Sequence, residues 1–321
     1  MNALWVEPDI RDEIIKYVRM LNTKTDIVYG RLISLLGIQE SKFYSWSSRI
    51  GKPNFHNHML PKSNWLLEDE KQALLRFAKA HPGEGYRRLT YMMLDDGVVA
   101  VSPSTTYRLL KGYGLLDQWN TVKSSLKGTG FIQPKKPHEH WHIDIKYVNY
   151  HGSFLFLISI IDGYSRYIIN HELRTSMEEL DVEFTIAKAF EKFPDQKPRI
   201  ISDNGSQFLS RDFAEYLKIE GLKHVRTSVN YPQSNGKIER YHRTISEECL
   251  RKKSMINLED ARNQIQTYVD FYNNKRLHSS LYYLTPSDFL SGSVKDKLDI
   301  REKKLRDAKA IRFNFRTALT N

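Results

Sequence analysis

Three runs of sequence decide the fold: WHIDIKYVNY (141–150), FLFLISII (154–161) and RYIINHEL (166–173). Each run is rich in β-branched and aromatic residues, which favour extended backbone. Short turn-forming stretches separate the runs, at Asn149 to Ser153 and at Asp162 to Ser165. Strand-like runs divided by such short turns predict three consecutive antiparallel strands.

The residues after these runs alternate between helical and strand patterns. The pattern predicts helices over 178–193, 211–219, 234–251 and 258–274, and strands over 198–203 and 222–227. Three meandering strands followed by helix, strand, helix, strand and helix form a mixed α/β sandwich of the ribonuclease H type. We therefore predict an α/β ribonuclease H-like catalytic core, preceded by all-α domains.

The first 50 residues have a helical pattern. Between Ile10 and Leu36 apolar residues recur at spacings of three and four, as on one face of an amphipathic helix. A turn at Gly37 then opens a third segment, IQESKFYSW (38–46). Three short helices with a glycine turn before the last are typical of a helix-turn-helix, whose last helix would enter the major groove with Gln39 to Lys42 leading. A three-helix bundle that binds no DNA is the alternative.

A second helical group is predicted over 66–80, 86–94 and 104–111. Ser102 and Pro103 suit the N-cap and the first position of its last helix. The residues that it offers to a DNA groove are Ser104, Thr105, Thr106 and Arg108. Because a helical bundle with a purely structural role seldom repeats the helix-turn-helix pattern, two such groups in tandem favour DNA recognition.

Proline-bearing, basic and non-periodic stretches mark the domain boundaries. We expect a helix-turn-helix over 1–50, a linker over 51–65, a second helix-turn-helix over 66–117, a basic linker over 118–139, the catalytic core over 140–257, a helical closing segment over 258–290 and a basic C-terminal tail over 291–321. The tail carries 9 Lys and Arg against 4 acids, and we expect it to be helical in part and poorly packed.

Positive charge is concentrated on both sides of the predicted core. The chain has 49 Lys and Arg against 38 Asp and Glu, a net charge of +11. Residues 1–139 contribute +6, residues 140–257 contribute +1 and residues 258–321 contribute +4. Basic flanks around a nearly neutral middle favour a polyanionic partner that the flanks bind.

Length and composition exclude several classes of protein. With 321 residues, 40% hydrophobic and 27% charged, the chain is globular and long enough for two or three domains. A single cysteine, Cys249, excludes an internal disulfide framework and suits a reducing compartment. The longest apolar run, 154–161, is far shorter than the roughly 20 residues of a membrane-spanning helix. We therefore expect no membrane partner and no export.

Three carboxylates lie in predicted strands and in a predicted helix at positions where an acidic side chain indicates a chemical role. Asp144 lies within a predicted buried strand, Asp203 ends another, and Glu239 lies within a predicted helix. If they converge, they repel one another unless cations lie between them, and such hard oxygen ligands hold Mg²⁺ or Mn²⁺. Two such ions stabilise the attacking and leaving oxygens of an in-line phosphoryl transfer. We predict that all three residues are catalytic and bind the metal.

Residues near these carboxylates could bind DNA or assist the metal. Asn235 and Arg243 share the helix face of Glu239 and are predicted to hold a phosphate or a terminal base. Lys237 and Arg240 lie off that face and are expected to be ordinary solvated charges. His142, two residues before Asp144, shares its strand face. It either ligates a metal or orients a water, or it is a hydrogen-bonded structural histidine.

The motifs WHIDIKYV, ISDNGSQF and YPQSNGKIERYHRT, with 35 residues between Asp203 and Glu239, resemble the catalytic core of the retroviral integrase superfamily, specifically the transposases of bacterial insertion sequences. GYRRLTYMML and VSPSTTYRLL resemble the helix-turn-helix that precedes that core, and NKRLHSSLYYLTPSDFL resembles the segment that closes it. The resemblance covers residues 10 to 290. The paired His and Cys of the retroviral zinc-binding domain are missing, and tandem helix-turn-helix units replace them.

The resemblance implies a DDE transposase that cuts DNA at transposon ends and joins the freed 3′-hydroxyl to target DNA. It implies Asp144, Asp203 and Glu239 as metal ligands, with Mg²⁺ or Mn²⁺, two ions per site, as cofactor. The partners would be the terminal repeats, target DNA and further copies of the chain, in a homodimer or larger assembly, with the protein cytoplasmic and nucleoid-associated in a bacterium. The alternatives are a DNA-binding regulator with an inactive core and a ribonuclease H-like nuclease that cuts without joining.

Overall fold

The computed structural model describes residue 6 and residues 8–52, 65–116, 133–227 and 235–320, with the backbone alone for 316–320. The chain divides into two compact units. One comprises residues 1–65 with 311–321, and the other comprises residues 66–310. Among the described residues, every helix is too short or too polar to cross a membrane.

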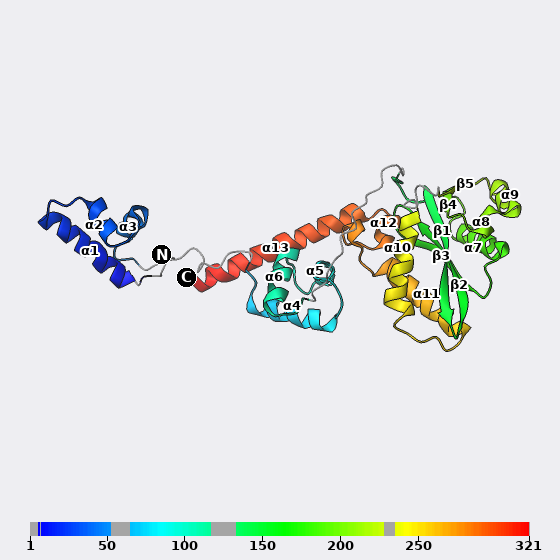
Figure 1. The fold of residues 1–321 in the computed structure, drawn as a ribbon, viewed down its shortest axis with the longest axis horizontal. Helices are drawn as coiled ribbons and strands as arrows, with labels where there is room; N and C mark the ends of the chain where they lie inside the picture. The colour runs from blue at the N-terminus through cyan, green and yellow to red at the C-terminus, as the bar shows by residue number, and fades with distance from the viewer. Residues whose placement is uncertain (1–5, 7, 53–64, 117–132, 228–234, 321) are drawn as a thin grey trace. The chain divides into compact units, whose positions relative to one another are not determined.

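The N-terminal unit contains the three short helices that the sequence predicts (Figure 1). They are α1 (Pro8–Lys24), α2 (Tyr29–Leu35) and α3 (Glu40–Ser47). Gly37 turns the chain between α2 and α3 with φ +66°, a conformation that favours glycine. The buried Arg11 donates to the backbone carbonyls of Arg49 and Lys52, at 2.8 and 2.9 Å, and so fastens α1 to the segment after α3.

A second three-helix group opens the larger unit. Its helices are α4 (Glu68–Ala80), α5 (Tyr86–Asp95) and α6 (Pro103–Gly112). Ser102 caps α6 by accepting from the backbone N–H of Thr105, and proline fills the first helical position, as predicted. Inside the group the hydroxyl of Thr90 donates to that of Thr106 at 2.8 Å. Thr106 is therefore buried and does not face a DNA groove, contrary to the prediction.

A five-stranded mixed sheet forms the centre of the core, in the order β3-β2-β1-β4-β5. Its strands are β1 (His140–Tyr150), β2 (Ser153–Asp162), β3 (Ile168–Arg174), β4 (Arg199–Ser202) and β5 (Lys223–Arg226). The first three strands pair antiparallel, whereas β4 and β5 pair parallel to β1 and β4. The predicted meander and mixed α/β topology are confirmed.

Helices cover both faces of this sheet (Figure 1). Alternate β1 residues point to opposite faces, so Trp141 and Ile143 pack with α7 and α9, while Val148 packs with α10 and α11. The helices and turns of the core are α7 (Glu179–Lys192), α8 (Ser206–Leu209), α9 (Arg211–Ile219), α10 (Gly236–Ile245), a π-helical turn (Ser246–Leu250), α11 (Leu258–Asn274), a 3₁₀ turn (Ser279–Leu281) and α12 (Pro286–Leu290).

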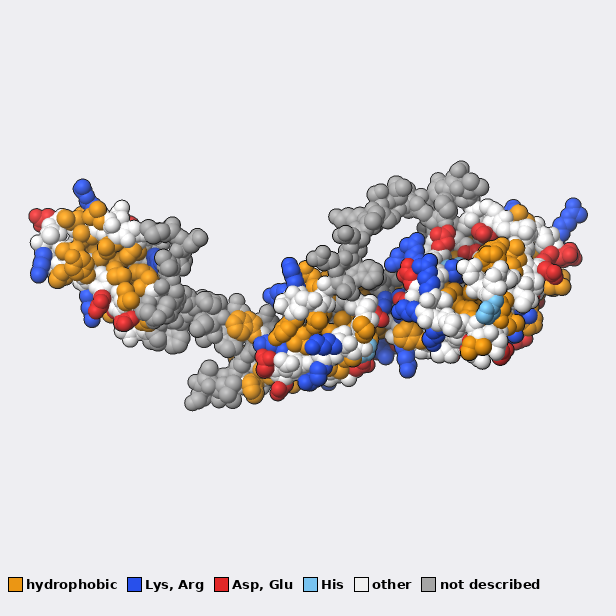
Figure 2. All heavy atoms as spheres, turned by 60° about the horizontal axis from the view of Figure 1, so that its bottom comes forward, with side chains coloured by type: hydrophobic (Ala, Val, Ile, Leu, Met, Phe, Trp, Pro, Cys, Tyr) orange, Lys and Arg blue, Asp and Glu red, His pale blue; other side chains and the backbone are white. Residues whose placement is uncertain are grey.

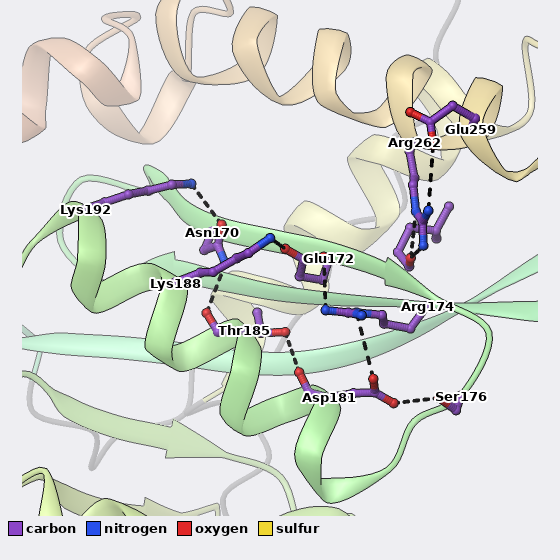
Figure 3. A network of polar contacts seen from close by, with 11 residues as sticks. Asn170, Glu172, Arg174, Ser176, Asp181, Thr185, Lys188, Lys192, Glu259 and Arg262 are labelled. Carbon is purple, nitrogen blue, oxygen red and sulfur yellow. Dashed lines mark hydrogen bonds and ion pairs between the residues drawn. The ribbon is translucent and has the colours of Figure 1, made fainter.

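Polar contacts join the outer strand β3 to α7 (Figure 3). Asn170 donates to the backbone carbonyl of Thr185 at 3.0 Å and accepts from Lys192 at 2.8 Å. Lys188 pairs with Glu172 at 2.8 Å. The bond from Asn170 to Thr185 is buried, whereas the contacts of Lys188 and Lys192 are partly exposed and each contributes little on its own.

The long helix predicted over 234–251 is interrupted. Regular α10 ends at Ile245 and continues as a π-helical turn, Ser246–Leu250. The side chain of Ser246 donates to the backbone carbonyl of His242 at 2.6 Å, and the N–H of Arg251 reaches back to the carbonyl of Ser246 at 3.0 Å. A side chain that competes for a backbone carbonyl in this way leaves the spacing of apolar residues unchanged. The apolar spacing therefore does not predict the interruption.

The C-terminal tail is better packed than its composition predicts. It forms α13 (Val294–Thr320), within which Arg301 is 4% exposed. The guanidinium donates to both carboxylate oxygens of Asp95, at 2.8 and 2.6 Å, and to the backbone carbonyls of Tyr282 and Tyr283. The expectation of a poorly packed tail is wrong at Arg301, because its guanidinium binds the Asp95 carboxylate and two backbone carbonyls.

Asn273 provides a test of how α11 is attached to the sheet. Its buried amide accepts from the backbone N–H of Ile168 at 2.8 Å and donates to the carbonyl of Ile168 at 3.0 Å. We expect Asn273→Ala to lower the free energy of unfolding by about 2–4 kcal/mol, because two buried backbone groups lose their partner. Urea unfolding measures this change. Asn263→Ala, on an exposed face of α11, is the control, and an equal effect of both variants would contradict the account.

Candidate active site

The parallel pairing of β1 with β4 places Asp144 and Asp203 level with each other. His142 is opposite Ile201 in the register, and each aspartate lies two residues further along its chain. An equal step of two residues keeps the same sheet face, so both carboxylates are directed towards the face that α10 covers. The fold therefore brings together two of the three predicted carboxylates.

Asp203 is held where β4 ends. Its Oδ1 accepts from the backbone N–H of Gly205 at 2.9 Å. The neighbouring Asn204 donates to the carbonyl of Thr227 at 3.0 Å, which ties the loop to the residue after β5. The loop therefore fixes the start of α8 and leaves the second carboxylate oxygen of Asp203 for another ligand.

Helix α10 brings His242 to Asp144. The Nδ1 atom of His242 lies 3.4 Å from Oδ2 of Asp144, and the histidine is 7% exposed. Glu239 lies one helical turn earlier and is exposed to solvent. Since residues three apart share a helix face, Glu239 stands on the Asp144 side of α10. No role for His242 was predicted from the sequence, although its position three residues after Glu239 places it on the same side of the helix.

The three predicted carboxylates do not form a closed cluster. Within the described parts of the chain, no group of three or more His, Cys, Asp or Glu side chains could hold a metal ion. The donors nevertheless suit a hard cation, since two strand aspartates lie level and an exposed glutamate projects from the covering helix. Residues 228–234, which lead into α10, lie outside the described residues.

His142 lies inside the protein rather than at the carboxylates. It is fully buried, and a β-carbon at Gly163 would come within 2.9 Å of its Nε2 atom, so only glycine fits there. Burial, together with the charges of Lys237 and Arg166, lowers the pKa of His142 to about 3. A neutral histidine packed against a glycine favours the structural alternative.

Asn235 and Arg243 occupy different environments. Asn235 is 3% exposed and lies near His142, whereas Arg243 is exposed on α10. Of the two predicted DNA contacts, only Arg243 is therefore presented to solvent. The expectation that Lys237 is a solvated charge is wrong, because its Nζ donates to the backbone carbonyl of Gly163 at 2.7 Å and burial lowers its pKa to about 7.

The predicted DNA contacts of the helical groups differ in exposure. Lys42 is half-buried, with Nζ 5.0 Å from the ring centre of Trp46. Thr105 is half-buried and its hydroxyl lies 3.0 Å from that of Ser102. Ser104 and Arg108 are exposed on α6, where Arg108 also donates to the backbone carbonyl of Ser104 at 3.3 Å.

Comparison with known proteins gives two overlapping matches to integrase core domains. Two family models, both described as "Integrase core domain", match residues 134–232 and 220–286. The InsK protein of insertion sequence element IS150 from Escherichia coli (strain K12) is 23% identical over 76% of this chain and 90% of its own length. The transposase for insertion sequence element IS629 from Shigella sonnei is 24% identical over 81% of this chain and 90% of its own length. A solved structure, the HTLV-2 integrase catalytic core domain in complex with magnesium, covers 49% of this chain and 98% of its own with 19% identity and a TM-score of 0.40.

The buried His142 predicts a pH dependence of stability. Its pKa is about 3 in the fold against 6.5 in the unfolded chain, so between these values only the unfolded chain takes up the proton. The contribution of His142 to stability is therefore lost as pH falls below 6.5, at up to about 1.4 kcal/mol per pH unit. Urea unfolding at pH 7.5, 6 and 5 should show the stability difference between wild type and His142→Gln shrinking as pH falls. A constant difference would contradict the assignment.

Proposed function

This chain belongs to the insertion-sequence transposases of the retroviral integrase superfamily, and we propose that it cuts DNA at the ends of its element and joins the freed 3′-hydroxyl to target DNA. The observation that carries the proposal is the level placement of Asp144 in β1 and Asp203 directly after the parallel strand β4, beneath the helix that bears Glu239. Carboxylates so placed suit phosphoryl transfer between DNA strands.

Asp144, Asp203 and Glu239 hold Mg²⁺ or Mn²⁺, two ions per site, in this proposal. When bound, the ions supply Lewis-acid stabilisation of the attacking and leaving oxygens. The residues of the chain do the rest: the two aspartates are set by strand register, and Glu239 is carried by a helix that packs on the same sheet face. His242 positions the Asp144 carboxylate.

DNA is bound by the basic parts of the chain that flank the core. Arg243 on α10 contacts the strand at the active site. The exposed Ser104 and Arg108 on α6, with the half-buried Thr105 on α6 and Lys42 on α3, contact the terminal repeats. The buried Asn235 supports His142 and does not contact DNA in this scheme. Because two transposon ends must meet, the protein acts as a homodimer or larger assembly on DNA.

Neutral substitutions of the carboxylates test the proposed site. We expect Asp144→Asn, Asp203→Asn and Glu239→Gln each to reduce strand transfer by at least about 10³-fold, because an amide cannot replace an ionised metal ligand. The assay joins a labelled duplex carrying the element's end to a plasmid in Mg²⁺ or Mn²⁺. Affinity for the same duplex without metal should stay within about twofold of wild type.

Glu215→Gln, an exposed glutamate on α9, is the matched control and should transfer strands as wild type does. Full activity in any of the three carboxylate variants would remove that residue from the site. Cleavage without joined product by wild type would indicate a nuclease. Binding of the end without metal-dependent cleavage would indicate a regulator.

The contact of His242 with Asp144 gives a separate test. Removal of a residue that orients a metal ligand typically lowers metal affinity about 10–100-fold. We expect His242→Leu to shift the Mn²⁺ concentration for half-maximal cleavage upward by that factor, with most of the rate restored at saturating Mn²⁺. His242→Gln, which can still donate a hydrogen bond, should recover part of the affinity. An unchanged Mn²⁺ dependence in His242→Leu would show that the contact has no positioning role.

A further inference from the structure

A cavity of about 510 Å³ lies beside α10 in the larger unit. Its walls come from α5, from the turn between β2 and β3, from α10 with its π-helical turn, and from the end of α11 with the segment after it. Figure 2 shows Lys and Arg side chains gathered at the end of the core that carries α10. The cavity is a different surface from the carboxylate site, although the same helix borders both.

Basic side chains dominate the lining. The cationic residues are Arg88, Arg166, Lys237, Arg240, Arg243 and Arg276, and the anionic residues are Glu247 and Glu248. Glu248 is already engaged by Arg276, which donates to its two oxygens at 2.8 and 2.6 Å. Arg88 pairs with Glu84 at 2.5 Å. After these pairs are counted, positive charge remains in excess within the cavity.

Arg166 is the residue that most needs an anion. It has φ +64°, a strained conformation for a residue other than glycine, and its backbone N–H bonds to the carbonyl of Asp162 at 3.0 Å. The side-chain carboxylate of Asp162 accepts from the N–H and hydroxyl of Ser165, both at 2.7 Å, which fixes the turn. The Nη1 atom of Arg166 is buried without a hydrogen-bond partner within the described structure. A guanidinium stays charged when buried, so such an orphaned donor is costly unless a ligand accepts from it.

The cavity and the metal site lie on adjoining stripes of α10, since Glu239 is four residues from Arg243 and three from His242. The cavity is lined by Gly236, Arg240, Arg243 and Glu247, which follow one another at spacings of three and four. His242, which contacts Asp144, points to another side of the helix. A strand whose end is held at the carboxylates could therefore place a neighbouring phosphate in the cavity.

We propose that this cavity binds a backbone phosphate of DNA, with Arg166 as its half-buried donor and Arg240 as its exposed donor. The proposal rests on the proposed function, since it takes the polyanion to be DNA. A lining rich in N–H donors suits the acceptor oxygens of a phosphate, and planar guanidinium groups bind such oxygens in pairs. Inorganic phosphate presents the same oxygens, so the test separates the two sources.

The test measures the affinity of the full-length protein for a labelled end-bearing duplex at several salt concentrations, without metal. Arg166→Asn removes the guanidinium and retains a residue that tolerates positive φ. We expect its affinity at about 0.1 M salt to fall about 10-fold, and its dependence of log K on log salt to become shallower by about one, because one phosphate contact is lost. Arg240→Gln, an exposed residue, should change both quantities in the same direction and serves if Arg166→Asn does not fold.

Arg211→Gln removes an exposed cation from α9 and is the matched control, with no expected change. A wild-type salt dependence in folded Arg166→Asn and in Arg240→Gln would overturn the inference. A second result would also overturn it: inorganic phosphate stabilises the wild type but not Arg166→Asn, and the two proteins bind DNA with the same affinity. The cavity would then bind free phosphate and not DNA. Strand transfer is measured separately with wild type and Glu239→Gln. If Arg166→Asn shows the shallower salt dependence but the wild type forms no joined product, the result counts against the proposed function and not against this phosphate contact.

Discussion

The pairing of β1 with β4 is the constraint on which the rest of the structure depends. β1 lies in the middle of the sheet, antiparallel to β2 on one side and parallel to β4 on the other. The parallel register sets Asp203 level with Asp144, and the strand alternation sends both to the face covered by α10. A slip of one residue between β1 and β4 would place the two carboxylates on opposite faces, so the chemistry depends on a register that the apolar residues on both faces of β1 hold in place.

Different faces of the short helix α10 have different contacts. Ile238, Tyr241 and Ile245 pack on the sheet and anchor the helix. His242 reaches Asp144, and Arg240 is on the side that lines the basic cavity. Because these roles lie on adjoining stripes of one rigid element, a strand that contacts the cavity and the carboxylates would be oriented by the helix itself.

Much of the fold and of the site could be predicted from sequence, because strand composition, apolar spacing and capping residues are local signals. The three strands at 141–173 and the cap at Ser102 are examples. Contacts between distant segments carried no such signal: the bonds of Arg301 to Asp95, and of Asn273 to Ile168, join residues far apart in the chain. The sequence also did not show the surroundings of residues near the site, since the burial of Lys237 and Asn235 depends on packing that spacing alone does not reveal.

The central claim is that Asp144 and Asp203, together with Glu239, form one metal-binding site. The most direct measurement is a crystal structure of the full-length protein grown with Mn²⁺, with the ion located by its anomalous scattering. The account predicts an anomalous peak in contact with carboxylate oxygens of both Asp144 and Asp203, and Glu239 turned towards it. Mn²⁺ bound elsewhere, with the two aspartates free of metal at saturating concentration, would contradict it.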